Sequence, residues 1–487
     1  MPHLAPVVLA LLALADPPTP TPPQQQPTAP MDVVSALESA LVDAIARAEP
    51  SVVAIAREKD GKTEETTAIR GRTPAPPAIQ DAPIGFGVFR GGFEDLDNVE
   101  YVASDYGSGV VIGEKGEILT TFSVVKGASR LVVRAPGVKE FDAEVLAADS
   151  RSDLAVIVPR EVPGQRSPAL RPLPLGDGTK LRKGMFLLAL GNPFNAGRDG
   201  KASASWGILA NVARRLDAAH LRYEQNKRQL RHYPTLLQLD AKLNLGMSGG
   251  AVVNLKGELI GLTTNAANAG GFDAQAGYAL PMDSLARRAI EALRQGREVE
   301  YGFLGIGLSD DGSNRVGTVQ PGTPAGEGGM MPGDEVVSIG EIPVVDSDSL
   351  VMAVNAFSPG LPIRVRLRRD GEELEKTVVL SKLRITGEVI ATSRPAPWRG
   401  LRVDFLSTDP RVSYGPAVLK AMAQGGVLVT EVVPGSAADD AGIKVGQCII
   451  KVDGHPVKTP GDFVNVVKGL TGPVTLATEG EQVVTVR

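Results

Sequence analysis

Cysteine is almost absent from this 487-residue chain: Cys448 is the only one, so no disulfide can form within it. Histidine is also scarce, and none of the four has the spacing of metal ligands; they are His3, His220, His232 and His455. Long basic runs are missing and the net charge is −5, which argues against nucleic acid as the main partner. We therefore expect no disulfide scaffold, no metal site, no other cofactor and no nucleic-acid partner.

Apolar residues and turn residues, by contrast, are plentiful. Hydrophobic residues make up 43% of the chain, enough for real cores, and its length suggests about three domains. Glycine (55) and proline (37) are frequent, whereas aromatic residues make up only 4%. From Gly107 to about Leu280, short β-rich runs are broken by glycine without intervening helices, which predicts a mainly β barrel or sandwich. One helix is expected after these strands, from Met282 to Gln295.

The chain begins with an apolar stretch, Leu4 to Ala15, which ends in the small-x-small sequence Ala13-Leu14-Ala15. This pattern predicts a signal peptide over residues 1–15, and hence an exported protein of the periplasm or cell envelope; the alternative is a disordered apolar tail. The stretch is too short to span a bilayer, so we expect no membrane span. Residues 16–30 are rich in proline, threonine and glutamine, which predicts an extended linker.

Three further segments differ in character from the predicted strands. Apolar residues at helical spacing predict a helix from Asp32 to Ala48, and a strand follows from Ser51 to Ala56. Residues 57–105 are polar, proline-rich and irregular, with aromatic residues at Gly85–Phe89 that would form a docking element or pin the loop down. The charged stretch from Leu216 to Gln238 is expected to be a helical insert.

A repeat occupies the last third of the chain. Pro321-Gly-Thr-Pro-Ala325 recurs as Pro434-Gly-Ser-Ala-Ala438, at an offset of 113 residues. A strand, a glycine turn and a helix follow in each copy, with the helices expected at Ser347–Ala356 and Pro460–Leu470. Two copies indicate two similar domains rather than a solenoid, which needs three or more repeats. The repeat resembles PDZ domains.

Four segments in the middle of the chain occur in an order that is typical of one protease family. Ile118–Val125 matches the segment that carries the histidine base, but Ser123 stands in the histidine position. Ser150–Val156 matches the acid segment, and Gly191–Phe194 matches a signature at the start of the second barrel. Gly246–Gly250 matches the nucleophile segment. Together these segments resemble the HtrA/Deg family of trypsin-like serine proteases.

This resemblance implies a domain order for nearly the whole chain, from about Met31 to Arg487. A double β-barrel domain of the trypsin/chymotrypsin type would be followed by two α+β PDZ domains. The expected bounds are 31–298 for the trypsin-like domain, 299–384 for the first PDZ domain, 385–398 for a linker and 399–487 for the second PDZ domain.

The resemblance also implies catalytic positions. Asp153 would be the acid, Ser248 the nucleophile, and Gly246 with Ser248 would supply the oxyanion N–H groups. A serine hydroxyl is a weak nucleophile that needs an adjacent base, and Ser123 has no titration near pH 7. Without the imidazole, Ser248 stays protonated, and loss of a base from such a unit costs on the order of 10⁶ in rate.

Other residues bear on whether any proteolytic activity remains. Leu245 and Met247 stand where the family usually has proline and asparagine, which suggests a nucleophile loop no longer held for chemistry. His220 and His232 are candidates for a substitute base, although solvated positions on a polar helix face are the simpler interpretation. Lys242 is a further candidate, but a Ser–Lys pair requires a buried lysine. Without such a base, Ser248 would be a relic that caps a turn.

The start of the first repeat resembles the carboxylate-binding loop of PDZ domains. Backbone N–H groups of this loop would cradle a chain-terminal carboxylate; the residues are Tyr301, Gly302, Phe303, Leu304 and Gly305. The strand from Gly305 to Leu308 would present an edge for β-augmentation, and Val351 and Val354 would line the side-chain pocket. The alternative is a first strand with a glycine bulge.

The second copy opens with Arg399-Gly400-Leu401-Arg402-Val403, a poorer match because Arg402 would lie inside the loop. This domain would bind weakly or pack against a neighbouring subunit. The family assembles as trimers or larger cages, so the resemblance implies a trimer-based homo-oligomer, or an assembly with an active relative. The early helix could contribute to that assembly.

Three functions remain open from the sequence. The expected one is an exported, catalytically inactive protease homologue that binds peptides or unfolded protein C-termini in protein quality control. The second is an active serine endopeptidase with a non-standard base, supported by the retained Ser248 and Asp153. The third is a structural or scaffold protein of the envelope. Peptide binding by the first PDZ domain would separate the first function from the third.

Overall fold

The computed structural model describes residues 30–58, 106–192, 200–215, 235–244, 246–264, 277–385, 387–410, 425–479 and 482–487. The predicted signal peptide, the loop after Glu58, His220, His232 and Leu245 lie outside the described residues. The predictions made for them therefore stay predictions.

The first barrel follows the long helix α1 (Pro30–Ala48), which confirms the helix predicted from apolar spacing. Six strands close into a ring in the order β5-β4-β1-β2-β3-β6, because β5 also pairs with β6. Their bounds are β1 Val52–Glu58, β2 Tyr106–Val111, β3 Ile118–Thr121, β4 Arg130–Ala135, β5 Val138–Asp149 and β6 Leu154–Pro159. Within the described part of the chain, no helix is long and apolar enough to cross a membrane.

The second barrel is closed in the order β10-β11-β12-β9-β8-β7. Its strands are β7 Phe186–Gly191, β8 Ser203–Arg215, β9 Thr235–Leu239, β10 Ala251–Val253, β11 Leu259–Thr263 and β12 Gly277–Pro281. β9 lies at the end of the predicted helical insert, so the helix prediction is wrong for these residues. Leu237 and Leu239 are buried there, and pairing with β8 and β12 stabilises the extended chain.

Each barrel has its own apolar core, and a third core spans both. Ile55, Val133 and Ile157 are among the residues that fill the first barrel. Leu187 and Leu237 belong to the core of the second. The third core joins residues of both barrels to the last turns of α1 and to α3 (Ser284–Arg294). Burial of apolar side chains on both faces of the strands explains why the predicted β-rich runs fold as two packed barrels.

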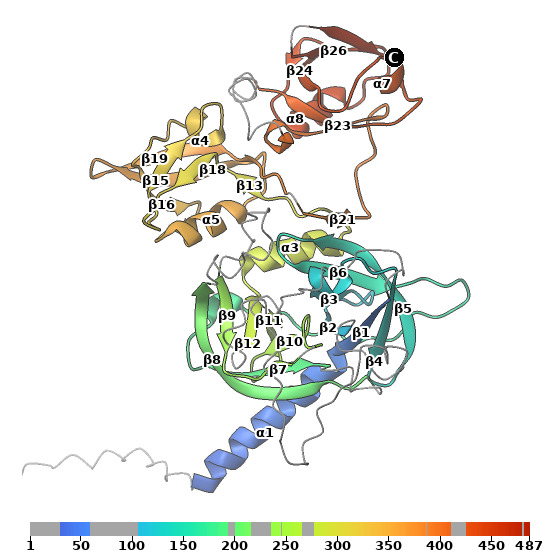
Figure 1. Ribbon diagram of the computed structural model, residues 1–487, viewed down its shortest axis with the longest axis vertical. Helices are drawn as coiled ribbons and strands as arrows, with labels where there is room; N and C mark the ends of the chain where they lie inside the picture. Colours follow the sequence, from blue (N-terminus) through green and yellow to red (C-terminus); the bar gives the residue numbers. More distant parts are fainter. Residues whose placement is uncertain are drawn as a thin grey trace, which may run out of the picture.

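The first repeat forms a small α+β domain above α3 (Figure 1). Its elements are β13 Gly302–Phe303, β14 Ile306–Leu308, β15 Val316–Val319, α4 Pro324–Glu327, β16 Glu335–Ile339, β17 Ile342–Pro343, α5 Ser347–Asn355, β18 Pro362–Arg369, β19 Glu372–Val379 and β20 Ser381–Lys382. α5 begins with a capping box: the Asp346 carboxylate accepts from the Ser349 N–H, and the Ser349 hydroxyl oxygen accepts from the Asp346 N–H. The helix predicted at Ser347–Ala356 is confirmed.

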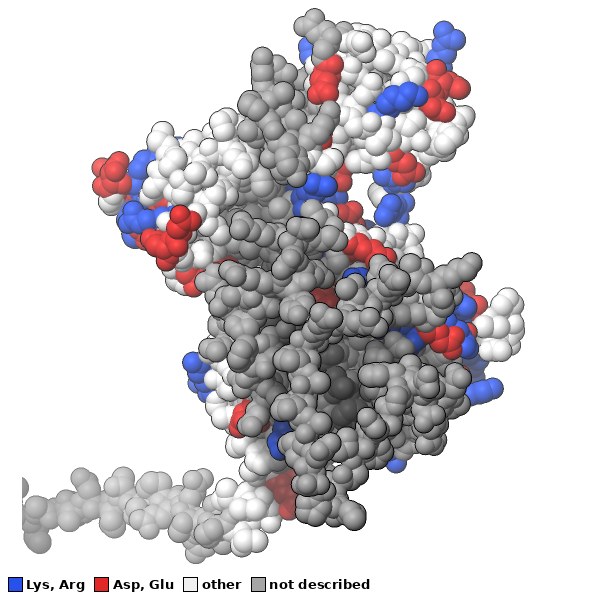
Figure 2. All heavy atoms as spheres, in the orientation of Figure 1, with Lys and Arg blue, Asp and Glu red and all other residues white. Residues whose placement is uncertain are grey.

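The second repeat has the same order of elements and lies at the far end of the molecule from α1 (Figure 1). Its elements are β22 Leu401–Phe405, η7 Leu406–Thr408, β23 Val427–Val432, α7 Ala437–Asp440, β24 Cys448–Val452, β25 His455–Pro456, α8 Pro460–Val467, β26 Val474–Thr478 and β27 Val483–Val486. In the face that Figure 2 shows, acidic and basic side chains are mixed and form no patch of one sign among the coloured atoms.

The segment between the repeats does more than connect them. β21 (Val389–Ala391) lies inside the predicted linker and pairs antiparallel with β5, where Val389 faces Asp149. The chain therefore returns to the first barrel between the two repeats, as Figure 1 shows. α3 is also attached to this barrel, because Arg294 Nη2 lies 3.0 Å from Glu117 Oε1 in the turn before β3.

Candidate active site

Ser248 lies in a tight loop before β10. The backbone of this loop requires glycine on either side of Ser248. Gly249 has φ +82°, and an added Cβ there would lie 2.2 Å from Ser108 O and 2.4 Å from Thr120 Oγ1. Gly246 also has a positive φ, +87°. These glycines allow the tight turn that carries Ser248, whose side chain is buried.

Hydrogen bonds from both barrels hold the nucleophile loop. Ser108 N–H donates to Ser248 O at 2.8 Å, and Ser108 Oγ donates to Gly246 O at 2.9 Å. The Thr263 hydroxyl donates to Met247 O, and the Met247 side chain is buried in the second barrel. The described residues of the loop are therefore held in place, and whether they are held for chemistry stays a prediction. Ser108 was missed; its signal is a polar residue between two glycines in an apolar strand.

Thr121 occupies the space between Ser248 and Ser123. Its hydroxyl oxygen lies 3.3 Å from Ser248 Oγ and 2.9 Å from Ser123 Oγ, and either partner could donate in each contact. Thr121 is fully buried at the end of β3, whereas Ser123 is exposed in the short helix α2 (Phe122–Val125). Three hydroxyls thus form a chain at the position where a base is needed. Sequence reasoning did not single out Thr121.

Asp153 lies beside Ser123, as the family order predicts. It has φ +56°, a left-handed conformation that aspartate adopts more readily than most residues. Asp153 Oδ1 accepts a hydrogen bond from Ser123 N–H at 3.0 Å, and Oδ2 accepts one from Thr264 Oγ1 at 3.4 Å. The Asp153 carboxylate thus contacts the main chain of residue 123, the position predicted to correspond to the histidine. Ser123, Asp153 and Ser248 therefore share one site, and their chemical roles stay predictions.

None of the three candidates for a substitute base is placed to act by the described residues. Lys242 is exposed, so the burial that a Ser–Lys pair requires is missing. His220 and His232 lie outside the described residues. The residues that the structure describes contain no group of three or more His, Cys, Asp or Glu that could hold a metal ion.

Tyr301, the first residue of the predicted carboxylate-binding loop, is buried against the first barrel. Its hydroxyl donates a hydrogen bond to Asp149 Oδ2 at the end of β5. The guanidinium carbons of Arg151 and Arg288 lie 5.2 and 5.7 Å from the centre of its ring. Burial, and then the negative charge of Asp149, raises the pKa of Tyr301 well above its usual value. Tyr301 is fully buried, so its side chain is not available to a ligand.

The other residues of the predicted carboxylate-binding loop contact either the core of the first repeat or the second repeat. Leu304 is buried in the core of the first repeat, and Phe303 packs against the second repeat. Close backbone approach requires glycine twice: an added Cβ would lie 2.6 Å from Val354 O at Gly302 and 2.2 Å from Thr323 Cβ at Gly305. Gly305 has φ +83°.

The neighbouring groove has an open strand edge. Among the described strands, β14 pairs only with β15, so its other edge can accept a peptide strand. Val351 is half-buried on α5, and Val354 is buried in the domain core. This arrangement agrees with the predicted β-augmentation, which stays a prediction.

The equivalent loop of the second repeat differs from its predicted register. Gly400 has φ +85°, and Arg399 O accepts from Ala438 N–H at 3.2 Å, just as Leu304 O accepts from Ala325 N–H at 2.9 Å. The loop therefore ends at Gly400, and Arg402 lies on β22, so its placement inside the loop is wrong. Leu401 N–H already donates to Trp398 O at 2.8 Å, which leaves this loop one donor fewer for a ligand carboxylate.

The fold and the site define a trypsin-like double barrel with two PDZ domains, and comparisons with known proteins agree. The trypsin-like peptidase domain family matches residues 107–262. Two PDZ domain families match residues 302–380 and 428–477. We call these two domains PDZ1 and PDZ2.

Relatives narrow the assignment to one family. The probable periplasmic serine endoprotease DegP-like of Rhizobium meliloti (strain 1021) is 30% identical over 376 residues, which cover 74% of this chain and 69% of that protein. The periplasmic pH-dependent serine endoprotease DegQ of Escherichia coli (strain K12) is 29% identical over 375 residues, 74% of this chain and 75% of that protein. The solved HtrA-type protease AlgW with tripeptide is 23% identical, with a TM-score of 0.48, covering 73% of this chain and 98% of that one. This chain belongs to the HtrA/Deg family of serine endoproteases.

Proposed function

We propose that this chain is an exported HtrA/Deg-family protein that has lost proteolytic activity and binds peptides or unfolded protein C-termini in protein quality control. The observation that carries the proposal is the contact of Ser248 with Thr121, where a protease of this fold needs a base. Export is supported by the apolar start of the chain and by relatives that are named as periplasmic.

The chemical reason is the protonation state of Ser248. Thr121 and Ser123 offer only hydroxyls, which do not accept a proton from serine near neutral pH. Asp153 could orient a base, but the side chain next to it at residue 123 is a serine hydroxyl, and the Ser123 N–H donates to its carboxylate. Loss of the base from such a unit costs on the order of 10⁶ in rate, and oxyanion donors alone leave little catalysis.

An active endopeptidase with another base is the second candidate, and the retained Ser248 and Asp153 favour it. The test is to incubate the mature chain with unfolded casein beside its Ser248→Ala variant. Absence of cleavage by both proteins supports the proposal. Cleavage by the wild type and not by the variant would overturn it, since Ser248 would then have a working base.

Peptide binding by PDZ1 is the second half of the proposal. The open edge of β14 and the glycine-shaped loop at Gly302 and Gly305 suit an extended peptide with a free carboxylate. We expect fluorescence anisotropy to detect binding of a labelled peptide with a free C-terminus, and weaker binding of the same peptide amidated. Equal binding of both peptides, or of neither, would favour a scaffold role.

The proposed assembly is a trimer-based homo-oligomer, or an assembly with an active relative. Helix α1 carries exposed apolar residues, including Val33, Val34 and Val42. Phe186 and Trp206 on the second barrel are also partly exposed, with ring centres 6.0 Å apart. Apolar surface of this kind marks association sites in many proteins. Sedimentation analysis of the mature chain would give the number of subunits.

A further inference from the structure

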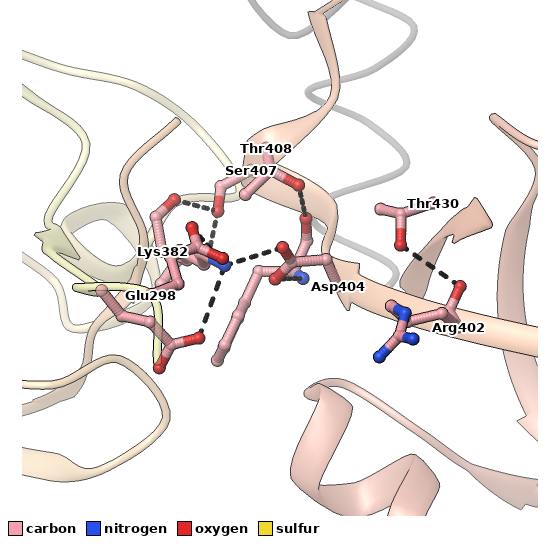
Figure 3. A network of polar contacts seen from close by, with 10 residues as sticks. Glu298, Lys382, Arg402, Asp404, Ser407, Thr408 and Thr430 are labelled. Atoms are coloured by element: carbon pink, nitrogen blue, oxygen red, sulfur yellow. Dashed lines mark hydrogen bonds and ion pairs between the residues drawn. The ribbon is translucent and has the colours of Figure 1, made fainter. Parts of the chain in front are cut away.

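Lys382 joins three parts of the chain where the two PDZ domains meet. Its Nζ lies 2.8 Å from Asp404 Oδ2, 3.1 Å from Glu298 Oε1 and 3.4 Å from Glu300 Oε1. Lys382 ends β20 of PDZ1, Asp404 lies on β22 of PDZ2, and both glutamates lie between α3 and β13. Figure 3 shows Glu298 and Asp404 converging on the ammonium group from opposite sides. We call these four residues the Lys382 junction.

The Lys382 junction depends on its single positive charge. Lys382 is 4% exposed, so the three carboxylates replace the water around its ammonium group. Burial alone would lower the pKa of Lys382, but attraction by Asp404, Glu298 and Glu300 outweighs burial and raises it. Removal of the ammonium would leave the three carboxylates facing one another, which favours separation of the segments that carry them.

Other contacts at the junction connect PDZ2 to the ligand loop of PDZ1. Ser407 Oγ donates to Lys382 O at 2.7 Å and lies 2.5 Å from Ser381 Oγ. Phe303 pairs with Ser381 across β13 and β20. The Phe303 side chain packs against a cluster of PDZ2 that consists of Leu406, Leu428 and Cys448. We call this apolar cluster, together with Phe303, the Phe303 contact.

A cleft lies between PDZ1 and PDZ2 beside the Lys382 junction. The cleft has a volume of about 740 Å³, and its lining includes Lys382, Leu383, Asp404, Leu428 and Val429. The cleft reaches the Lys382 junction, so the polar and apolar contacts described above lie at its edge. Loss of one of these contacts would weaken the attachment of PDZ2 along that edge.

We propose that the Lys382 junction is a releasable lock that holds PDZ2 against PDZ1 and, through the Phe303 contact, braces the carboxylate-binding loop. The brace rests on the proposed function, because it requires that PDZ1 binds peptides. Phe303 precedes Leu304 and Gly305, whose N–H groups are predicted to cradle the carboxylate. Fixing Phe303 limits the conformations of these groups before binding, which favours affinity.

Cys448 provides a direct readout of the lock, because it is the only cysteine and is fully buried in the Phe303 contact. We would measure its rate of reaction with a thiol reagent in the full chain and in Lys382→Met. Release of PDZ2 should accelerate the reaction by about tenfold or more. The milder Asp404→Asn should act in the same direction. Rates equal to the wild type in both variants would overturn the lock.

Two controls separate opening of the junction from local unfolding. Lys376→Met removes a lysine of PDZ1 from β19, away from the junction, and should leave the rate unchanged. Hydrogen exchange of β26, inside the PDZ2 sheet, should stay slow in Lys382→Met if PDZ2 moves as an intact domain. Faster exchange of β26 would attribute the reaction of Cys448 to unfolding of PDZ2 and count against the lock.

Peptide affinity tests the brace separately. In Lys382→Met, we expect a peptide with a free C-terminus to bind PDZ1 about three- to tenfold more weakly. Faster labelling of Cys448 with unchanged affinity would keep the lock and overturn the brace. Failure of the wild type to bind any such peptide would count against the proposed function, while the labelling experiment would still decide the lock.

Discussion

Residue 123 is where we predict the main chemical difference from an active protease of this family. The loop around Ser248 is held by Ser108 and Thr263, and Asp153 lies where the acid is expected. The loop and the carboxylate are therefore in fixed positions, and their catalytic roles stay predictions. A single substitution can test these roles.

Ser123→His should introduce cleavage of unfolded casein. The imidazole would start beside Asp153, whose Oδ1 is 3.0 Å from the N–H of residue 123, and would compete with Thr121 for Ser248. We expect a gain of about 10²–10⁴-fold over background, the range of general base catalysis. Ser123→His combined with Ser248→Ala should stay at background. No gain in the single variant would mean that the site cannot use a base.

Tyr301→Phe should destabilise the chain, because it removes the hydroxyl that donates to the buried Asp149. The Ser152 N–H, at 2.9 Å from Asp149 Oδ2, remains as a donor. We expect a loss of roughly 1–3 kcal/mol in the free energy of unfolding measured with urea. The matched control is Tyr278→Phe, whose hydroxyl has no hydrogen bond to the described residues; it should change stability far less.

The stability difference between wild type and Tyr301→Phe should also depend on pH. The folded pKa of Tyr301 is raised, so its contribution is fully present below the pKa of an unfolded tyrosine, about 10. Above that pH the unfolded chain loses the phenolic proton first, and the advantage of the wild type shrinks. Urea titrations at neutral pH and at pH values above about 10 would measure this. A constant difference would contradict the buried, neutral tyrosine.

At the scale of elements, the end of β5 is the point where later segments return to the first barrel. Asp149 binds Tyr301 from the start of PDZ1 and faces Val389 of β21. α3 is joined to the same barrel through Glu117. These contacts set where PDZ1 begins relative to the barrels, although none of them belongs to a regular pattern in the sequence.

Arg294→Met should loosen α3 from the first barrel. Glu117 is buried, and the variant leaves its carboxylate with only backbone donors such as the Lys115 N–H. We expect a loss of roughly 1–3 kcal/mol, less than for a fully buried pair because Arg294 is one-third exposed. Burial opposes the charged carboxylate, yet backbone donors and Arg294 lower the pKa of Glu117, so the contribution should disappear as pH falls.

The control for this prediction is an exposed ion pair. Arg364 lies 3.8 Å from Glu341, and both side chains are mostly in solvent. Arg364→Met should therefore change the free energy of unfolding by less than about 0.5 kcal/mol. An equal effect of both variants would contradict the role of burial at Glu117.

At the scale of the whole molecule, PDZ1 contacts both of its neighbours through one loop. Tyr301 joins it to the first barrel, and Phe303 joins it to PDZ2. α1 projects at the opposite end, with its first half away from the barrels (Figure 1). The exposed apolar residues of α1 are thus placed to meet another chain rather than PDZ1 or PDZ2.

Val34→Asp should reduce the proposed assembly without unfolding the chain. Val34 is 56% exposed on α1, so the substitution costs little within one subunit but places a charge in an apolar contact. We expect a lower mass by sedimentation at the same concentration. Ser35→Asp, a charge on the exposed neighbouring residue, should have a smaller effect. An unchanged mass for Val34→Asp would remove α1 from the proposed interface.

Local patterns in the sequence were enough to predict the elements. Alternation and apolar spacing predicted α1, most strands of both barrels and the helices of both repeats, because these signals depend on neighbours in the chain. β9 was predicted wrongly as part of a helix, since its extended form depends on pairing with β8 and β12. The register of the second loop was predicted wrongly for a similar reason, because Gly400 is identified by its positive φ and by the bond from Ala438 N–H to Arg399 O.

The sequence by itself determined the double barrel, the two PDZ domains, the family and the serine at position 123, because periodicity, repeats and ordered motifs are properties of the chain. Only the tertiary structure placed Thr121 between Ser248 and Ser123, Tyr301 on Asp149, and Lys382 among three carboxylates. These contacts join segments far apart in the chain, and burial sets the strength of each. A local pattern of residues therefore predicts neither the contact nor the burial.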